Sequence, residues 1–230
     1  MQYWSPRKAN HRYLTGHVTH RWMHRYTAMF ALLPLEGEAL LIVTPHEAYV
    51  CEKDSWITNI RTFPPVHSHQ GVDVITDAVC ELGLEEGCIG AELGGMVPLR
   101  MPHQDFGQLR RNLPRVDFVD VSEICFALRA RKSGPEVERI RQAVAITDTA
   151  YEVLFQQVNP GMTEQELWRL LALEHLKGGA EMPGSISLSP FIPGDDRACD
   201  RTLRRPTERV LTTGEMITAG CGGHLSGLLV

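Results

Sequence analysis

The sequence predicts an α/β domain over residues 1–121, a linker helix over 122–132 and a second domain of helices and strands over 133–230. Three observations predict this order. Short apolar runs alternate with helix-period segments in the first half. Two helix-start signals then follow at Ser133 and Thr163. Strand-like runs return only after those two helices.

Apolar runs over 26–33 and 39–44 flank the segment Pro-Leu-Glu-Gly-Glu at 34–38. The glycine and polar residues suit a short connection, so the two runs predict a β-hairpin. Alternating helices and strands follow, which favours a sheet with crossover helices because parallel neighbours need long connections. In order, the expected elements are a helix over 71–82, a strand over 88–93, a helix over 102–113 and a strand over 116–121.

Two capping boxes mark the helices of the second domain. Ser133 with Glu136 and Thr163 with Glu166 each match S/T-x-x-E, in which both side chains satisfy amides that the first helical turn leaves without partners. The first helix is expected to stop at Pro160-Gly161, and the second at Gly178-Gly179. The apolar stripe of the first helix comprises Val137, Ile140, Val144, Thr147, Tyr151 and Leu154. Strands are expected over 185–188 and 208–219, with a polar loop over 190–206 between them.

Composition excludes several classes of partner. The formal net charge is −5, and no run of lysine or arginine exceeds two residues, so a nucleic-acid surface is not expected. The apolar stretches are far shorter than the roughly 20 residues of a membrane helix. No signal-peptide core is found at the N-terminus, which predicts a cytoplasmic protein without membrane contact. The cysteines are expected to be reduced and mostly buried: Cys51, Cys80, Cys88, Cys125, Cys199 and Cys221.

Five segments in order resemble the creatinase, prolidase and Xaa-Pro aminopeptidase family (M24). They are N-H-R-Y-L-T-G at 10–16, the run at 128–143, P-G-M-T-E-Q-E-L at 160–167, G-A-E at 179–181 and P-T-E-R-V-L-T-T-G-E at 206–215. The resemblance implies that the first domain is the N-terminal domain of this family. It also implies that the second is an incomplete α+β catalytic domain with the pita-bread fold.

The resemblance further implies two divalent metals, such as Mn or Zn, held by two aspartates, a histidine and two glutamates. Counted from Gly214-Glu215, the first aspartate position falls on Gly220, which has no side chain to bind metal, and the second falls beyond Val230. The family's substrate-positioning histidine would fall at Leu203. We therefore expect no metal and no cofactor in this chain, and the sequence assigns no catalytic, cofactor-binding or metal-ligating residue.

Other candidate sites are weaker. His17, His20 and His24 would share one face of a helix, but no carboxylate has matching spacing, so a hydrogen-bonded surface is the simpler interpretation. His67 and His69 lie in a Pro-rich loop. The acids of the long loop, Asp195, Asp196 and Asp200, lack the spacing of an EF-hand. The glycines near the end of the sequence, Gly220, Gly222 and Gly223, lack the lysine of a phosphate-binding loop.

These observations lead to one interpretation with one alternative. The chain is interpreted as an M24-family hydrolase, truncated or deficient in its metal site, that takes a small amide or a proline-containing peptide if it is active. The alternative is a non-catalytic peptide-binding or scaffold module of the same fold. The resemblance also implies a homodimer.

Overall fold

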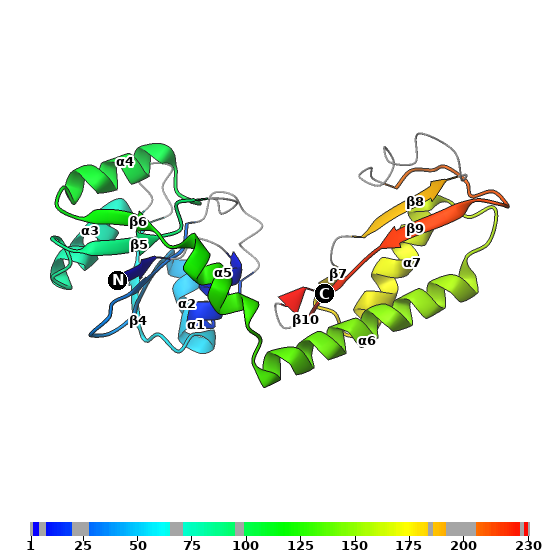
Figure 1. Ribbon diagram of the computed structural model, residues 1–230, viewed down its shortest axis with the longest axis horizontal. Coiled ribbons are helices and arrows are strands. Elements are labelled where there is room, and N and C mark those ends of the chain that lie inside the picture. The colour runs from blue at the N-terminus through cyan, green and yellow to red at the C-terminus, as the bar shows by residue number, and fades with distance from the viewer. Residues whose placement is uncertain are drawn as a thin grey trace. The chain divides into compact units, whose positions relative to one another are not determined.

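The computed structural model describes residues 2–4, 8–19, 28–64, 71–94, 99–183, 186–191, 206–225 and 228–229. They divide into two compact units, Met1–Arg131 and Lys132–Val230 (Figure 1). None of the helices in these described ranges has both the length and the apolar character that crossing a bilayer requires.

A six-stranded mixed sheet forms the centre of the first unit, in the order β4-β3-β2-β1-β5-β6. The expected hairpin is present: β2 (Phe30–Leu33) pairs antiparallel with β3 (Leu40–Val43), and Phe30 faces Ile42. Parallel pairs join β3 to β4, β1 to β5 and β5 to β6. The remaining strands are β1 (Gln2–Trp4), β4 (Asn59–Thr62), β5 (Cys88–Ala91) and β6 (Asp117–Asp120).

Five helices surround this sheet: α1 (Lys8–Thr15), α2 (Pro45–Asp54), α3 (Val72–Glu81), α4 (His103–Asn112) and α5 (Ser122–Ala130). The predicted elements α3, β5, α4, β6 and α5 are confirmed, with ends shifted inward by one or two residues. Strands β1 and β4 and helices α1 and α2 were not predicted from the sequence.

Alternate residues of the central strands bury on opposite faces of the sheet, as strand geometry requires. Phe30 and Leu32 of β2 pack with Ile75 of α3 and Leu109 of α4. Ala31, together with Leu41 and Val43 of β3, packs with Cys51 of α2. The first unit is therefore a three-layer α/β/α sandwich, in agreement with the predicted α/β domain.

The second unit is built on the helix pair α6 (Gly134–Gln157) and α7 (Glu164–Lys177). Both predicted capping boxes are confirmed: the Ser133 amide donates to Glu136 at 2.8 Å, and the Thr163 amide donates to Glu166 at 2.7 Å. Among the described residues, the helices accompany a two-stranded and a three-stranded sheet. The strands are β7 (Met182–Pro183), β8 (Ser187–Phe191), β9 (Met216–Gly220), β10 (Gly223–Leu225) and β11 (Leu228–Leu229).

Two local predictions in this unit are wrong. Val144 was placed on the apolar stripe of α6, but it is exposed, whereas Ala143, Thr147 and Ala150 are buried. Thr147 faces α7, where its hydroxyl lies 3.2 Å from His175 Nε2, and Ala150 packs with Leu167 and Leu171 of the same helix. The predicted strand over 208–219 begins only at Met216, because the residues before it bond to the start of α7 and then turn at Gly214, whose φ is 93°.

Candidate functional site

The segment of residues 206–215, called the approach segment below, runs along the N-terminus of α7 and leads into β9. Its backbone bonds tightly to the residues around the α7 cap. The Glu164 amide donates to Arg209 O at 3.0 Å, and the Leu211 amide donates to Met162 O at 2.7 Å. An isolated β-bridge joins Thr163 to Val210. These bonds explain why P-T-E-R-V-L and the capped helix occur together in the sequence.

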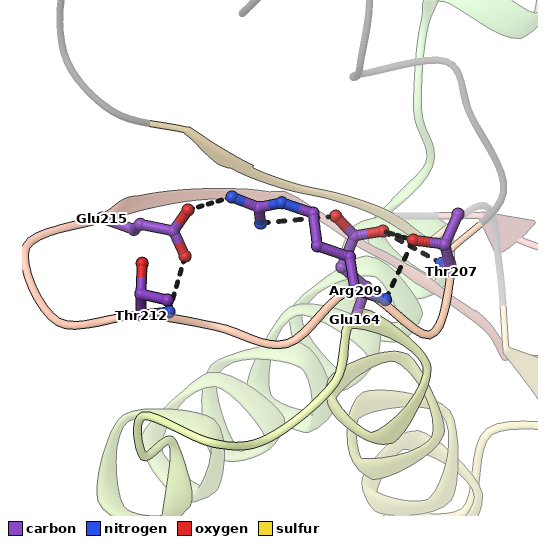
Figure 2. Close-up of polar contacts among 5 residues, drawn as sticks. All are labelled: Glu164, Thr207, Arg209, Thr212 and Glu215. Atoms are coloured by element: carbon purple, nitrogen blue, oxygen red, sulfur yellow. Dashed lines mark hydrogen bonds and ion pairs between the residues drawn. The ribbon is translucent and has the colours of Figure 1, made fainter.

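Polar side chains reinforce the same junction (Figure 2). The Glu164 carboxylate accepts from the Thr207 amide at 2.9 Å and from the Thr207 hydroxyl at 2.8 Å. The Arg209 guanidinium lies between two carboxylates: it is 3.6 Å from Glu164 and donates directly to Glu215. One cation therefore ties the first turn of α7 to the residue that precedes β9.

Glu215 closes the turn at the end of the approach segment. Its carboxylate also accepts from the Thr212 amide at 2.8 Å, which satisfies a second oxygen. Burial opposes ionisation of Glu215, but the Thr212 amide and the Arg209 guanidinium outweigh it, so the pKa of this carboxyl lies below its usual value. The side chain is 3% exposed. An ionised, paired Glu215 thus fixes where β9 begins.

Strand β9 has one covered and one exposed face. Ile217, Ala219 and the following Cys221 pack toward the core that Leu154 and Leu167 of the helices help to form. Met216, Thr218 and Gly220 alternate with them and are exposed; these three residues make up what we call the open face of β9. The position that the family resemblance gives to the first metal-binding aspartate is therefore a glycine on this open face.

The residues in the described part of the chain do not fit a two-metal centre. Gly220 offers no side-chain oxygen at the expected ligand position. Nowhere in the described ranges do three or more histidine, cysteine, aspartate or glutamate side chains gather with the geometry of a metal site.

The first unit contains the N-x-x-Y-L-T-G motif, and its residues are structural. Asn10 donates to the Glu92 carboxylate and accepts from Arg129 at 2.9 Å, which connects α1 to the end of β5 and to α5. Leu14 O accepts from the Trp56 indole at 2.8 Å, and Thr15 O accepts from the Ser55 hydroxyl at 2.6 Å. The motif therefore joins α1 to three other parts of the unit.

His17 was expected at a hydrogen-bonded surface, and its place at the surface is wrong. The residue follows α1 in a segment without regular structure and is completely buried. Its Nδ1 lies 3.2 Å from His11 Nε2, and its Nε2 lies 3.1 Å from Glu47 Oε2. The sequence near His17 has no carboxylate at a suitable spacing, and the one that contacts it is Glu47 of α2. Burial lowers the pKa of His17, against the opposing effect of Glu47.

The other sequence-level candidates divide into two groups. Cys51 and Cys125 are buried as expected, Cys221 is half-buried, and Cys80 and Cys88 are exposed. The remaining candidates lie outside the described residues: His20, His24, His67, His69, Asp195, Asp196, Cys199, Asp200 and Leu203. No signal in the sequence points to three glutamates that are buried in the structure. Glu47 lies beside His17, Glu92 beside Asn10 and Glu164 beside Arg209, and each pair joins segments that are distant in the sequence.

Two family models match the chain in order. The model of the creatinase/prolidase N-terminal domain matches residues 2–131, and the model of metallopeptidase family M24 matches residues 138–229. No curated protein sequence matches the chain.

Solved structures of similar fold cover nearly all of this chain. An X-Pro aminopeptidase from Thermotoga maritima MSB8 is 19% identical with a TM-score of 0.77, over 100% of this chain and 60% of its own. A Xaa-Pro dipeptidase from Bacillus anthracis is 20% identical with a TM-score of 0.78, over 100% and 58%. A prolidase from Pyrococcus horikoshii OT3 is 18% identical with a TM-score of 0.73, over 96% and 56%. The likeness shows a shared fold, and the chain spans 56–60% of the length of these three proteins.

Proposed function

The chain belongs to the creatinase/prolidase family of M24 metallopeptidases, and from this premise we propose that it is part of a hydrolase of the Xaa-Pro peptidase and creatinase-like class. The observation that carries the proposal is the match of both family models in their expected order. The fold of X-Pro aminopeptidases and prolidases over 96–100% of the chain supports it.

The substrate class we propose is a small amide or a proline-containing peptide. The similar structures include an X-Pro aminopeptidase, a Xaa-Pro dipeptidase and a prolidase, and these names point to peptides that contain proline. A homodimer in the cytoplasm is the assembly and location that we propose with this activity.

We further propose that the protein works without the family's two-metal centre. Gly220 at the first ligand position supports this, because an aspartate there would project a carboxylate from the open face of β9. The same observation favours a second candidate function: a non-catalytic peptide-binding or scaffold module that has kept the fold and lost the chemistry.

The test combines metal content with substrate turnover. Elemental analysis of the purified protein is expected to show no stoichiometric Zn²⁺, Mn²⁺ or Co²⁺; two tightly held metals per chain would overturn the metal-free proposal. A panel of Xaa-Pro dipeptides and small amides, assayed with and without a chelator, is expected to show hydrolysis that the chelator does not change. Saturable dipeptide binding without any turnover would favour the binding module.

Gly220→Asp provides the matched variant for the metal measurement. The new carboxylate is expected to restore one ligand and to raise the affinity for Mn²⁺ above that of the wild type. Thr218→Asp is the control, because residue 218 lies two positions along the same open face. Equal gains in the two variants would show that any added carboxylate attracts the cation and that Gly220 is not special.

A further inference from the structure

The hydroxyl of Tyr151 contacts the backbone next to Gly220. Tyr151, in the C-terminal half of α6, donates from Oη to the carbonyl oxygen of Ala219 at 2.9 Å. Cys221, on the other side of Gly220, packs against the same apolar cluster as Tyr151, and its thiol contributes to the raised pKa of Tyr151. The residue before Gly220 is thus bonded to a helix side chain, and the residue after it lies near the same side chain.

The strand needs support at this point. Ser187↔Gly220 is the last pair of the β8–β9 ladder, and the chain joins β10 of the other sheet at Gly223. Gly220 ends β9 and Gly222 precedes β10, and glycine leaves the backbone with more conformational freedom than other residues. A tertiary contact at this junction between two sheets is therefore expected to help β9 keep its register.

Tyr151 is well placed to supply that contact. Its helix is anchored by the buried neighbours Ala150 and Leu154, and its ring stacks on Phe155 with centroids 6.1 Å apart and an interplanar angle of 17°. Burial and the neighbouring Cys221 thiol raise the pKa of Tyr151 to about 12. The hydroxyl therefore keeps its proton, and remains a donor, over the whole range in which proteins work.

We propose that Tyr151 is a positioning residue that holds the backbone at Ala219–Cys221 and thereby fixes Gly220 on the open face of β9, where the peptide substrate binds. The location of the substrate rests on the proposed function. Tyr151 itself contacts the covered side of the strand, so it acts through the backbone and does not touch the substrate.

The test uses Tyr151→Phe, which removes the hydroxyl and keeps the ring and its stacking on Phe155. Loss of one hydrogen bond is expected to speed amide exchange over residues 219–222 about five-fold, with no change in the middle of α7. In the infrared difference spectrum, assigned with Cys221→Ala, the S–H stretching band of Cys221 is expected to move because the neighbouring hydroxyl is removed. Thr149→Ala, at an exposed position of the same helix, is the control and leaves both signals unchanged.

Binding of Xaa-Pro dipeptides separates positioning from simple packing. In Tyr151→Phe the dissociation constant is expected to rise by at least about five-fold while the urea midpoint of the second unit changes little. Unchanged exchange and an unchanged S–H band would overturn the proposal. Faster exchange with unaltered dipeptide affinity would overturn the positioning role. If the wild type binds no dipeptide at all, the proposed function fails, and exchange and the S–H band still decide whether Tyr151 holds the strand.

Discussion

Glu164 accepts two hydrogen bonds from Thr207, one from the backbone amide at 2.9 Å and one from the hydroxyl at 2.8 Å. These two bonds, both to Oε2 of Glu164, join the first turn of α7 to a segment that lies 43 residues later in the sequence. Arg209 extends this connection to Glu215, so the start of β9 is placed by charged groups that are mostly removed from water. The stability of the second unit should therefore depend on these few side chains.

Arg209→Met tests this dependence. The substitution keeps much of the side chain's length but leaves Glu164 and Glu215 without their shared cation, so we expect the second unit to lose about 2 kcal/mol of unfolding free energy. The matched control is Arg141→Met, which breaks an exposed Arg141–Glu138 pair and is expected to cost less than about 0.5 kcal/mol. Hydrogen exchange of the α7 amides in urea measures both. Equal costs would show that the Arg209 pairs contribute no more than a surface contact.

The elements that local chemistry encodes could be predicted from the sequence. Both capping boxes place a helix start through residues three apart, and the structure confirms Ser133–Glu136 and Thr163–Glu166. Elements whose pattern is ambiguous were missed. Strand β4 has the sequence Asn-Ile-Arg-Thr at the edge of the sheet, and its residues are only partly buried or exposed. It forms because β3 offers a parallel partner, which no local pattern reveals.

The candidate site was harder to predict for the same reason. The carboxylate of Glu47 meets His17, and that of Glu164 meets Thr207, only after distant segments have packed. On α6, the predicted apolar stripe and the residues that are buried share Thr147 and Leu154. They differ one position away, because Ala143 is buried where the hydrophobicity pattern favoured Val144.

Acid should destabilise the first unit through His17. Because burial lowers the folded-state pKa of His17, the unfolded chain binds a proton more readily, and stability falls as the pH drops below the ordinary value of about 6.5. Above that value both states are neutral at this residue and the contribution is constant. The groups that face His17 are His11 of α1 and Glu47 of α2, with Asp54 at the end of α2 also contributing.

Urea unfolding of the first unit between pH 8 and pH 5 measures this effect. His17→Gln is expected to flatten the pH dependence below 6.5, because glutamine does not titrate and can still accept or donate a hydrogen bond. His103→Gln, at an exposed position at the start of α4, is expected to leave the profile unchanged. A wild-type stability that rises on acidification would contradict the assignment of a buried, neutral His17.

The cysteines should react with iodoacetamide in the order of their exposure. Burial, together with the nearby Glu47 and Asp54, raises the pKa of Cys51 to about 12, so almost no thiolate is present at pH 8. Cys80 and Cys88 are exposed and are expected to be labelled first. Peptide mapping after short labelling measures the order, and labelling in denaturant, where the three rates converge, is the control. Fast native labelling of Cys51 would mean that α2 detaches readily from the sheet.

A pair of glycine substitutions separates backbone strain from steric contact. Gly16 ends the N-x-x-Y-L-T-G motif with a φ of 75°, and a β-carbon there would lie 3.0 Å from the backbone oxygen of Asp54. Gly37 has a φ of 96° in the β2–β3 turn, with no atom within 4 Å of the β-carbon position. Gly37→Ala is expected to cost about 1 kcal/mol for the left-handed conformation alone. Gly16→Ala is expected to cost about 2–3 kcal/mol, because the α2 terminus must also shift to relieve the contact. Thermal unfolding of the first unit compares the two variants, and equal costs would show that the chain around Asp54 moves aside without penalty.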